Sequence, residues 1–206
     1  YSTFARGGYY IEPYTFTKVV FLETDEVYEH KYEKTQAMSE ETAYMITDML
    51  ISATHAGVGG KINVSGTEVA SKTGTSTYDL NEARKYGIPD SASADNWIIT
   101  YSPDITISTW LGTDSMKEGY TDAIWGANQR IKISAILANK LMPKNSKFKK
   151  PSGVVSSKYE IETFPAELPS EHTPSYLIST ELFKKGTEPS EVSSRFTTLE
   201  APTKGE

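Results

Sequence analysis

The chain has 206 residues, a formal net charge of −6 and no cysteine. The absence of cysteine excludes disulfides, zinc–cysteine sites and thiol catalysis, and the acidic balance argues against nucleic acid as the main partner. With 37% apolar and 23% charged residues, the composition indicates a globular protein, and no apolar run reaches the ~20 residues of a membrane helix.

The first part of the chain predicts a hairpin followed by a helix. Residues 15–21 alternate in polarity as a strand does, and a second short strand over 27–30 would complete the hairpin. Ser39 is a suitable helix N-cap, and two glutamates follow it where the helix dipole favours carboxylates. Apolar residues then recur at helical spacing until the glycines that begin at Gly57 end the helix.

The middle of the chain predicts three strands. Residues 68–76 and 97–101 are separated by a long polar loop over 78–95, and a Ser-Pro-Asp turn leads into a third strand over 105–111. Strands joined by short turns pair in an antiparallel manner, so we expect an antiparallel meander.

A second amphipathic helix is predicted over 129–141, and Pro143 ends it. Seven of the ten prolines lie from position 143 onward. We therefore divide the chain into one domain over 1–150 and a small appendage of strands and loops over 151–206, which ends in a loose tail after about Arg195.

Metal and phosphate sites are disfavoured. The three histidines lie far apart in the sequence without a partner at ligand spacing, so scattered surface positions explain His30, His55 and His172 better than a metal centre. Residues 57–61 resemble a phosphate loop, but Ile62 stands where such a loop needs Ser or Thr. A plain helix C-terminus explains this glycine-rich stretch better.

Five lysines gather between positions 140 and 150. A solvated helix end, where cations complement the helix dipole, explains them better than a binding patch. Contact with an anionic polymer remains the alternative.

The run Lys72-Thr73-Gly74-Thr75 is the strongest chemical signal. A Lys-Thr-Gly triplet on a strand is one of three motifs of penicillin-interacting serine enzymes. Alone it is weak, because a chain of this length contains the triplet by chance with a probability of about 5%. The plain alternative is a strand end with a turn glycine.

The segments around the triplet strengthen its interpretation as a functional motif. Residues 96–103 read Asn-Trp-Ile-Ile-Thr-Tyr-Ser-Pro and residues 110–114 read Trp-Leu-Gly-Thr-Asp. Together with 1–14 and 181–189, these segments resemble the C-terminal part of the transpeptidase domain of class A penicillin-binding proteins. The resemblance implies an α+β fold in which an antiparallel sheet packs with helices.

One departure from the family pattern is large. The family's nucleophile motif Ser-x-x-Lys and its Ser-x-Asn motif do not occur before Lys72, and the only Ser-x-x-Lys, Ser146 to Lys149, is interpreted as coincidence. We therefore expect a C-terminal portion that lacks the nucleophile helix and the first strands of a five-stranded sheet. Its partner would be the missing N-terminal half, and the isolated chain would be inactive.

The resemblance implies peptidoglycan D,D-transpeptidation, in which a serine attacks a D-Ala-D-Ala stem peptide and β-lactams mimic that peptide. Lys72 would add positive potential and assist proton transfer. Thr73 and Thr75 would bind the substrate carboxylate, Gly74 would allow its close approach, and the Thr75 backbone N–H would serve the oxyanion hole. No cofactor or metal is implied. The protein would lie at the extracellular face of the bacterial cytoplasmic membrane, where a segment outside this chain would anchor it.

Strand alternation would place Lys72 and Gly74 on one face, with the two threonines on the other face or at the rim. The strand over 68–76 would form the active-site edge of the sheet, and Trp97 and Trp110 are predicted to lie in the core. Two alternatives remain open: a D,D-carboxypeptidase or β-lactamase-type hydrolase of the same superfamily, and a non-enzymatic cell-surface interaction module.

Overall fold

The computed structural model describes residues 1–57 and 62–196. The chain divides into two compact units, Tyr1–Lys149 and Lys150–Glu206. Most of the glycine-rich stretch that resembles a phosphate loop, and the end of the predicted tail, lie outside the described residues. Within those residues, no helix is both long enough and apolar enough to cross a membrane.

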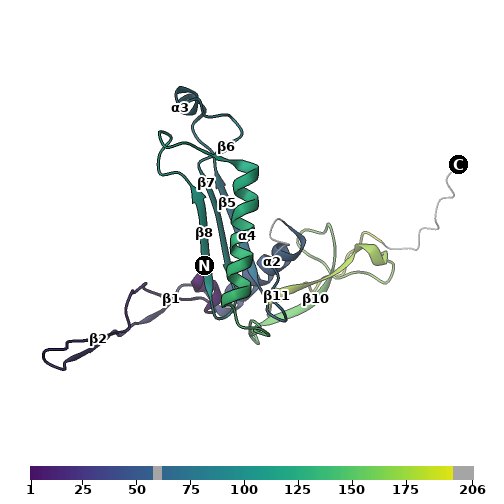
Figure 1. The fold of residues 1–206 in the computed structure, drawn as a ribbon. Helices are drawn as coiled ribbons and strands as arrows, with labels where there is room; N and C mark the ends of the chain where they lie inside the picture. The colour runs from purple at the N-terminus through teal and green to yellow at the C-terminus, as the bar shows by residue number, and fades with distance from the viewer. Residues whose placement is uncertain (58–61, 197–206) are drawn as a thin grey trace. The chain divides into compact units, whose positions relative to one another are not determined.

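The N-terminal segment forms a narrow two-stranded arm. After the short helix α1 (Ser2–Ala5), β1 (Tyr9–Ile11) pairs with β4 (Lys34–Gln36), and β2 (Lys18–Val20) pairs with β3 (Val27–Glu29), both in antiparallel register. The predicted hairpin is confirmed, although its strands have only three residues each. In Figure 1 the arm extends away from the central sheet, so its aromatic side chains stay exposed: Tyr10, Tyr14, Phe16, Tyr28 and Tyr32.

The predicted first helix is confirmed as α2 (Glu40–Ala56). The Ser39 side chain accepts a hydrogen bond from the Thr42 backbone N–H at 3.3 Å, and this satisfies one of the free donors at the helix start. Gly57 forms the C-cap. The helix packs against the first strand of the central sheet, which follows it in sequence.

The central sheet has three antiparallel strands in the order β5 (Ala70–Ser76), β7 (Asp95–Tyr101) and β8 (Thr106–Gly112). The predicted meander is therefore confirmed, and β5 is an edge strand. It begins two residues later than predicted because Glu68 binds elsewhere: its backbone N–H donates to the Ser146 carbonyl, and its carboxylate accepts from the Phe148 backbone N–H.

Helix α4 (Ala123–Leu141) lies along one face of this sheet and packs against β7 and β8 (Figure 1). Apolar side chains of the helix, the sheet and the segment before β5 meet there to form the main core: Ile62, Val64, Val69, Ile98, Ile107, Ile131, Ala138 and Met142. The helix begins six residues before the predicted start at 129, because the Asp122 side chain caps it through the Trp125 backbone N–H at 2.8 Å.

The predicted polar loop over 78–95 is partly wrong. It contains a short helix, α3 (Leu80–Lys85), whose N-cap Asp79 accepts hydrogen bonds from two backbone N–H groups at 3.0 Å each. It also contains β6 (Ala92–Ser93), which pairs with β9 (Thr121–Asp122). That pairing joins segments far apart in sequence, so local patterning gives no sign of it.

The second unit contains a two-stranded antiparallel ladder, β10 (Val154–Glu160) with β11 (Ile178–Lys184), and a single 3-10 turn, η1 (Ser175–Leu177). The rest of its described part is loop apart from two isolated β-bridges, Glu160 with Glu167 and Leu168 with Val192.

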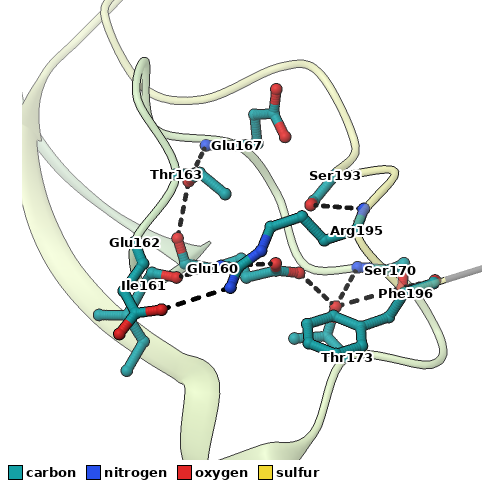
Figure 2. A network of polar contacts seen from close by, with 10 residues as sticks. All are labelled: Glu160, Ile161, Glu162, Thr163, Glu167, Ser170, Thr173, Ser193, Arg195 and Phe196. Carbon is teal, nitrogen blue, oxygen red and sulfur yellow. Dashed lines mark hydrogen bonds and ion pairs between the residues drawn. The ribbon is translucent and has the colours of Figure 1, made fainter. Parts of the chain in front are cut away.

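A buried carboxylate organises these loops, as Figure 2 shows. Glu160 is fully buried; it accepts a hydrogen bond from Thr173 Oγ1 at 2.6 Å and lies 3.3 Å from Arg195 Nη1. Arg195 also contacts the Glu162 carboxylate and donates to the Ile161 carbonyl. One buried charge thus connects the end of β10, the loop before η1 and the segment after β11, and burying a charge requires such partners.

Gly126 sets how closely α4 approaches the sheet. A Cβ at this position would lie 2.6 Å from Asn96 Nδ2 and 2.7 Å from Thr121 Cγ2, closer than real Cβ contacts. Gly126→Ala should therefore destabilise the protein by about 1–3 kcal/mol through overpacking. Helix propensity alone predicts the opposite effect, an increase in stability of up to about 1 kcal/mol. Urea unfolding measures the difference.

The control is Lys132→Ala at an exposed position of the same helix, which replaces one good helix former with another and should change the stability by less than about 0.5 kcal/mol. A stabilised Gly126→Ala protein would show that the helix does not depend on this close approach.

Candidate active site

The two threonines of the motif lie on the face of the sheet that α4 covers. Thr73 pairs with Ile98 and Thr75 pairs with Asn96, and paired residues of antiparallel strands point to the same face. Ile98 and Asn96 are completely buried on that face. Thr75 itself is exposed, because β5 is an edge strand and α4 packs mainly against β7 and β8.

Lys72 and Gly74 lie on the opposite face, where they pair with Ile99 and Trp97. Lys72 is exposed, and its ammonium donates a hydrogen bond to the Thr73 carbonyl at 2.9 Å. A Cβ on Gly74 would meet only the Trp97 Cβ at an ordinary 3.6 Å. Packing within the chain therefore does not require a glycine at this position.

The prediction that the two tryptophans lie in the core is wrong. Trp97 is 43% exposed and Trp110 is 37% exposed, with their ring centroids 6.1 Å apart. They pair across β7 and β8 on the face away from α4, whereas their neighbours Ile98 and Thr109 point toward the helix. Successive residues of a strand point to opposite faces, so the tryptophans point away from α4 when their neighbours point toward it.

Asp95 joins the ends of all three strands beside the motif. Its carboxylate accepts hydrogen bonds from Ser76 Oγ on β5 and, at 2.9 Å, from Trp110 Nε1 on β8. The bond from Ser76, followed by that from Trp110, holds the pKa of Asp95 below its ordinary value. Sequence reasoning missed this residue, because one aspartate at the start of a strand carries no signal of its own.

The other end of β5 is connected to α2. Thr54 Oγ1 donates to the Leu50 carbonyl at 2.6 Å and shares a 2.8 Å hydrogen bond with Ser71 Oγ, the residue before Lys72. Both hydroxyls are buried, so this bond forms in a medium that strengthens it. The motif strand is thus held by α2 at its start and by Asp95 at its end.

Arg130 is the second residue that sequence reasoning missed. It extends from α4, and its Nη1 donates to the Gly74 carbonyl at 2.8 Å and to Thr75 Oγ1 at 2.9 Å. The residue is only 4% exposed, and burial lowers the pKa of its guanidinium. Position 130 falls on an ordinary amphipathic helix, so only the tertiary structure shows that it reaches the motif.

The remaining sequence candidates lie apart from the motif. Ser146 Oγ donates to the Asp104 carboxylate, and among the described residues it has no hydrogen bond to Lys72. His30 stacks on Tyr14 in the arm, His55 lies in the last turn of α2, and His172 belongs to the second unit. The described residues contain no group of His, Asp and Glu side chains that could hold a metal ion.

Comparison with protein-family models assigns both units. Residues 1–143 match the model described as the penicillin-binding protein transpeptidase domain, and residues 150–198 match the penicillin-binding protein 1A C-terminal domain.

Individual relatives agree with this assignment. The chain is 36% identical over 95% of its length to penicillin-binding protein 1A/1B of Bacillus subtilis, and it spans 21% of that protein. It is 33% identical over 54% of its length to penicillin-binding protein 1A of Streptococcus oralis, of which it spans 18%. The crystal structure of penicillin-binding protein 1A from Haemophilus influenzae has the same fold, with a TM-score of 0.60 and 20% identity over 93% of this chain and 32% of that one.

The hydrogen bonds of Asp95 predict a pH-dependent stability. Because the folded-state pKa lies below the ordinary value, the carboxylate stabilises the fold at neutral pH. That stabilisation is lost as the pH falls from the ordinary carboxyl range through the lowered value. Asp95→Asn should therefore lose less thermal stability than the wild type between about pH 7 and about pH 3. Melting temperatures at both ends of this range measure the effect.

Asp114→Asn, at an exposed position just after β8, is the matched control and should retain the acid dependence of the wild type. Identical acid profiles for Asp95→Asn and the wild type would contradict the role given to Asp95.

Proposed function

The chain belongs to the penicillin-binding protein transpeptidase family, and from this we propose that it forms the Lys-Thr-Gly side of a peptidoglycan D,D-transpeptidase site. The reaction is acyl transfer: a serine attacks the D-Ala-D-Ala bond, D-Ala leaves, and an amine of a neighbouring stem peptide takes the acyl group. The observation that carries this proposal is that Lys72 to Thr75 occupy an exposed edge strand.

An edge strand suits an extended peptide substrate. Among the described strands, β5 has a neighbour on one side only, so an added strand of substrate could pair with its free backbone groups. Gly74 supports this role, since no described residue packs so closely that a glycine is needed there, and a missing side chain leaves room for the substrate backbone. β-Lactams, which mimic the D-Ala-D-Ala end, would occupy the same edge.

The side chains of the motif would recognise an anion and move protons. Lys72 provides an exposed ammonium on one face of the strand, and the hydroxyls of Thr73 and Thr75 provide donors on the other. The substrate's terminal carboxylate is the natural acceptor for these hydroxyls. The Thr75 backbone N–H would bind the oxyanion of the tetrahedral intermediate.

The nucleophile would come from another part of the protein. Within residues 1–206, no Ser-x-x-Lys precedes Lys72, so a serine outside this sequence would complete the site as the partner of β5. We assign 1–150 to the C-terminal portion of the transpeptidase domain and 151–206 to the appended C-terminal domain. The whole protein would work on the extracellular face of the bacterial cytoplasmic membrane, where its peptidoglycan substrate is.

Substitutions in the intact protein test the motif. Thr75→Val keeps the shape of the side chain but removes a hydroxyl that would bind a carboxylate, a bond worth about 1.5–3 kcal/mol. Acylation by benzylpenicillin should slow by about one to two orders of magnitude. Lys72→Ala should slow it further, because it removes a full charge from a site that binds an anion.

Lys132→Ala, which removes an exposed cation from α4, is the matched control and should acylate at the wild-type rate. A folded Lys72→Ala protein that acylates normally would remove β5 from the active site.

The 206-residue chain alone should take no covalent label from a fluorescent penicillin, because it contains no serine in a nucleophile motif before Lys72. A denaturing gel after incubation measures this, with the intact protein as the positive control. A labelled band of the isolated chain would show that one of its own serines is the nucleophile, and Ser146→Ala would then identify or exclude the first candidate.

A further inference from the structure

Arg130 is a buried cation without an anionic partner in the described part of the chain. It is 4% exposed, and it makes no ion pair with any carboxylate among the described residues. Its Nε is buried and has no hydrogen-bond partner among those residues either. Burying a charge is costly unless an opposite charge or several hydrogen bonds compensate it. The guanidinium therefore leaves uncompensated positive charge next to β5.

Its two hydrogen bonds connect this charge to the motif. Nη1 donates both to the Gly74 carbonyl and to Thr75 Oγ1. A guanidinium can only donate, so the Thr75 hydroxyl must be the acceptor in this bond. The proton of that hydroxyl then remains available for a second acceptor, and polarisation by the cation makes it a stronger donor.

The packing of α4 places Arg130 within reach of β5. Gly126 lies one helical turn earlier on the same side of the helix, and it allows α4 to approach Asn96 closely. Asn96 is the residue that pairs with Thr75. The close approach of α4 and the hydrogen bond from Arg130 therefore involve the same pair of residues, Asn96 and Thr75. This indicates that the packing of the helix fixes the position of the guanidinium.

We propose that Arg130 is a positioning residue that orients the Thr75 hydroxyl to donate to the carboxylate of the substrate and supplies positive charge behind it. This inference rests on the proposed function, because it names the group that prepares the same site for its anionic ligand. Arg130 acts through Thr75 and the Gly74 carbonyl and is not itself a catalytic residue.

The experiment compares an anionic and a neutral ligand in the intact protein. Benzylpenicillin carries the free carboxylate, and its methyl ester lacks the charge. Arg130→Met should slow acylation by benzylpenicillin by about 10-fold or more, since it removes the charge and frees the Thr75 hydroxyl to rotate. Acylation by the methyl ester should change less than about 2-fold, so the preference for the carboxylate falls. A purely structural role would slow both ligands equally.

Further variants complete the design. Arg130→Lys retains the charge but not the planar guanidinium, so it should keep part of the preference for benzylpenicillin over its methyl ester. Lys132→Met, two residues along the same helix, should leave both rates unchanged. In a double-mutant cycle, Arg130→Met should add little to the loss caused by Thr75→Val, because the arginine acts through that hydroxyl.

The outcomes separate this inference from the proposed function. If Thr75→Val and Lys72→Ala slow acylation while Arg130→Met does not, only the role of Arg130 is overturned. If all three acylate at the wild-type rate, the proposed function fails. If Arg130→Met does not fold, Arg130→Lys decides: a loss confined to benzylpenicillin supports the proposal, and any other result for this variant overturns it.

Discussion

The antiparallel pairing of β5 with β7 is the constraint on which the rest of the site depends. Its register places Thr75 opposite Asn96 and Gly74 opposite Trp97, and thereby decides which side chains face α4. A shift of one residue would exchange the faces and bring Lys72 toward the helix. The register is held at both ends of β5, by the buried Ser71–Thr54 hydroxyl pair and by the Asp95 carboxylate, which binds Ser76 and Trp110.

Helix α4 serves both the core and the site. Its apolar residues pack on β7 and β8, and burial of that surface provides most of the driving force for this contact. The same helix passes so close to Asn96 that a Cβ at position 126 would force its neighbours to shift. Arg130 lies one turn later, so the packing that stabilises the unit also delivers a cation to the edge strand. One helix thus both stabilises the unit and reaches the Lys-Thr-Gly strand.

The described residues of the second unit are organised differently, around a buried charge in place of an apolar cluster. Two strands and their loops surround the buried Glu160 carboxylate, which forms an ion pair with Arg195 and accepts a hydrogen bond from Thr173 (Figure 2). Removing one partner of such a buried pair leaves an uncompensated charge, so each partner constrains the others. A unit this small has little apolar surface to bury.

The sequence by itself determined the elements whose signals are local: the Ser39 cap of α2, the three strands of the meander and the Lys-Thr-Gly motif that led to the family. It did not reveal α3 or the early start of α4, since the Asp79 and Asp122 caps are single residues in polar surroundings. It misplaced Trp97 and Trp110, because an aromatic residue on a strand suits either face and only the packing of the helices on the sheet decides which positions are buried. Only the tertiary structure brought Arg130 to Thr75, 55 residues apart in sequence. Contacts between distant segments depend on how helices and strands pack, and no local pattern of residues shows which distant residues will meet.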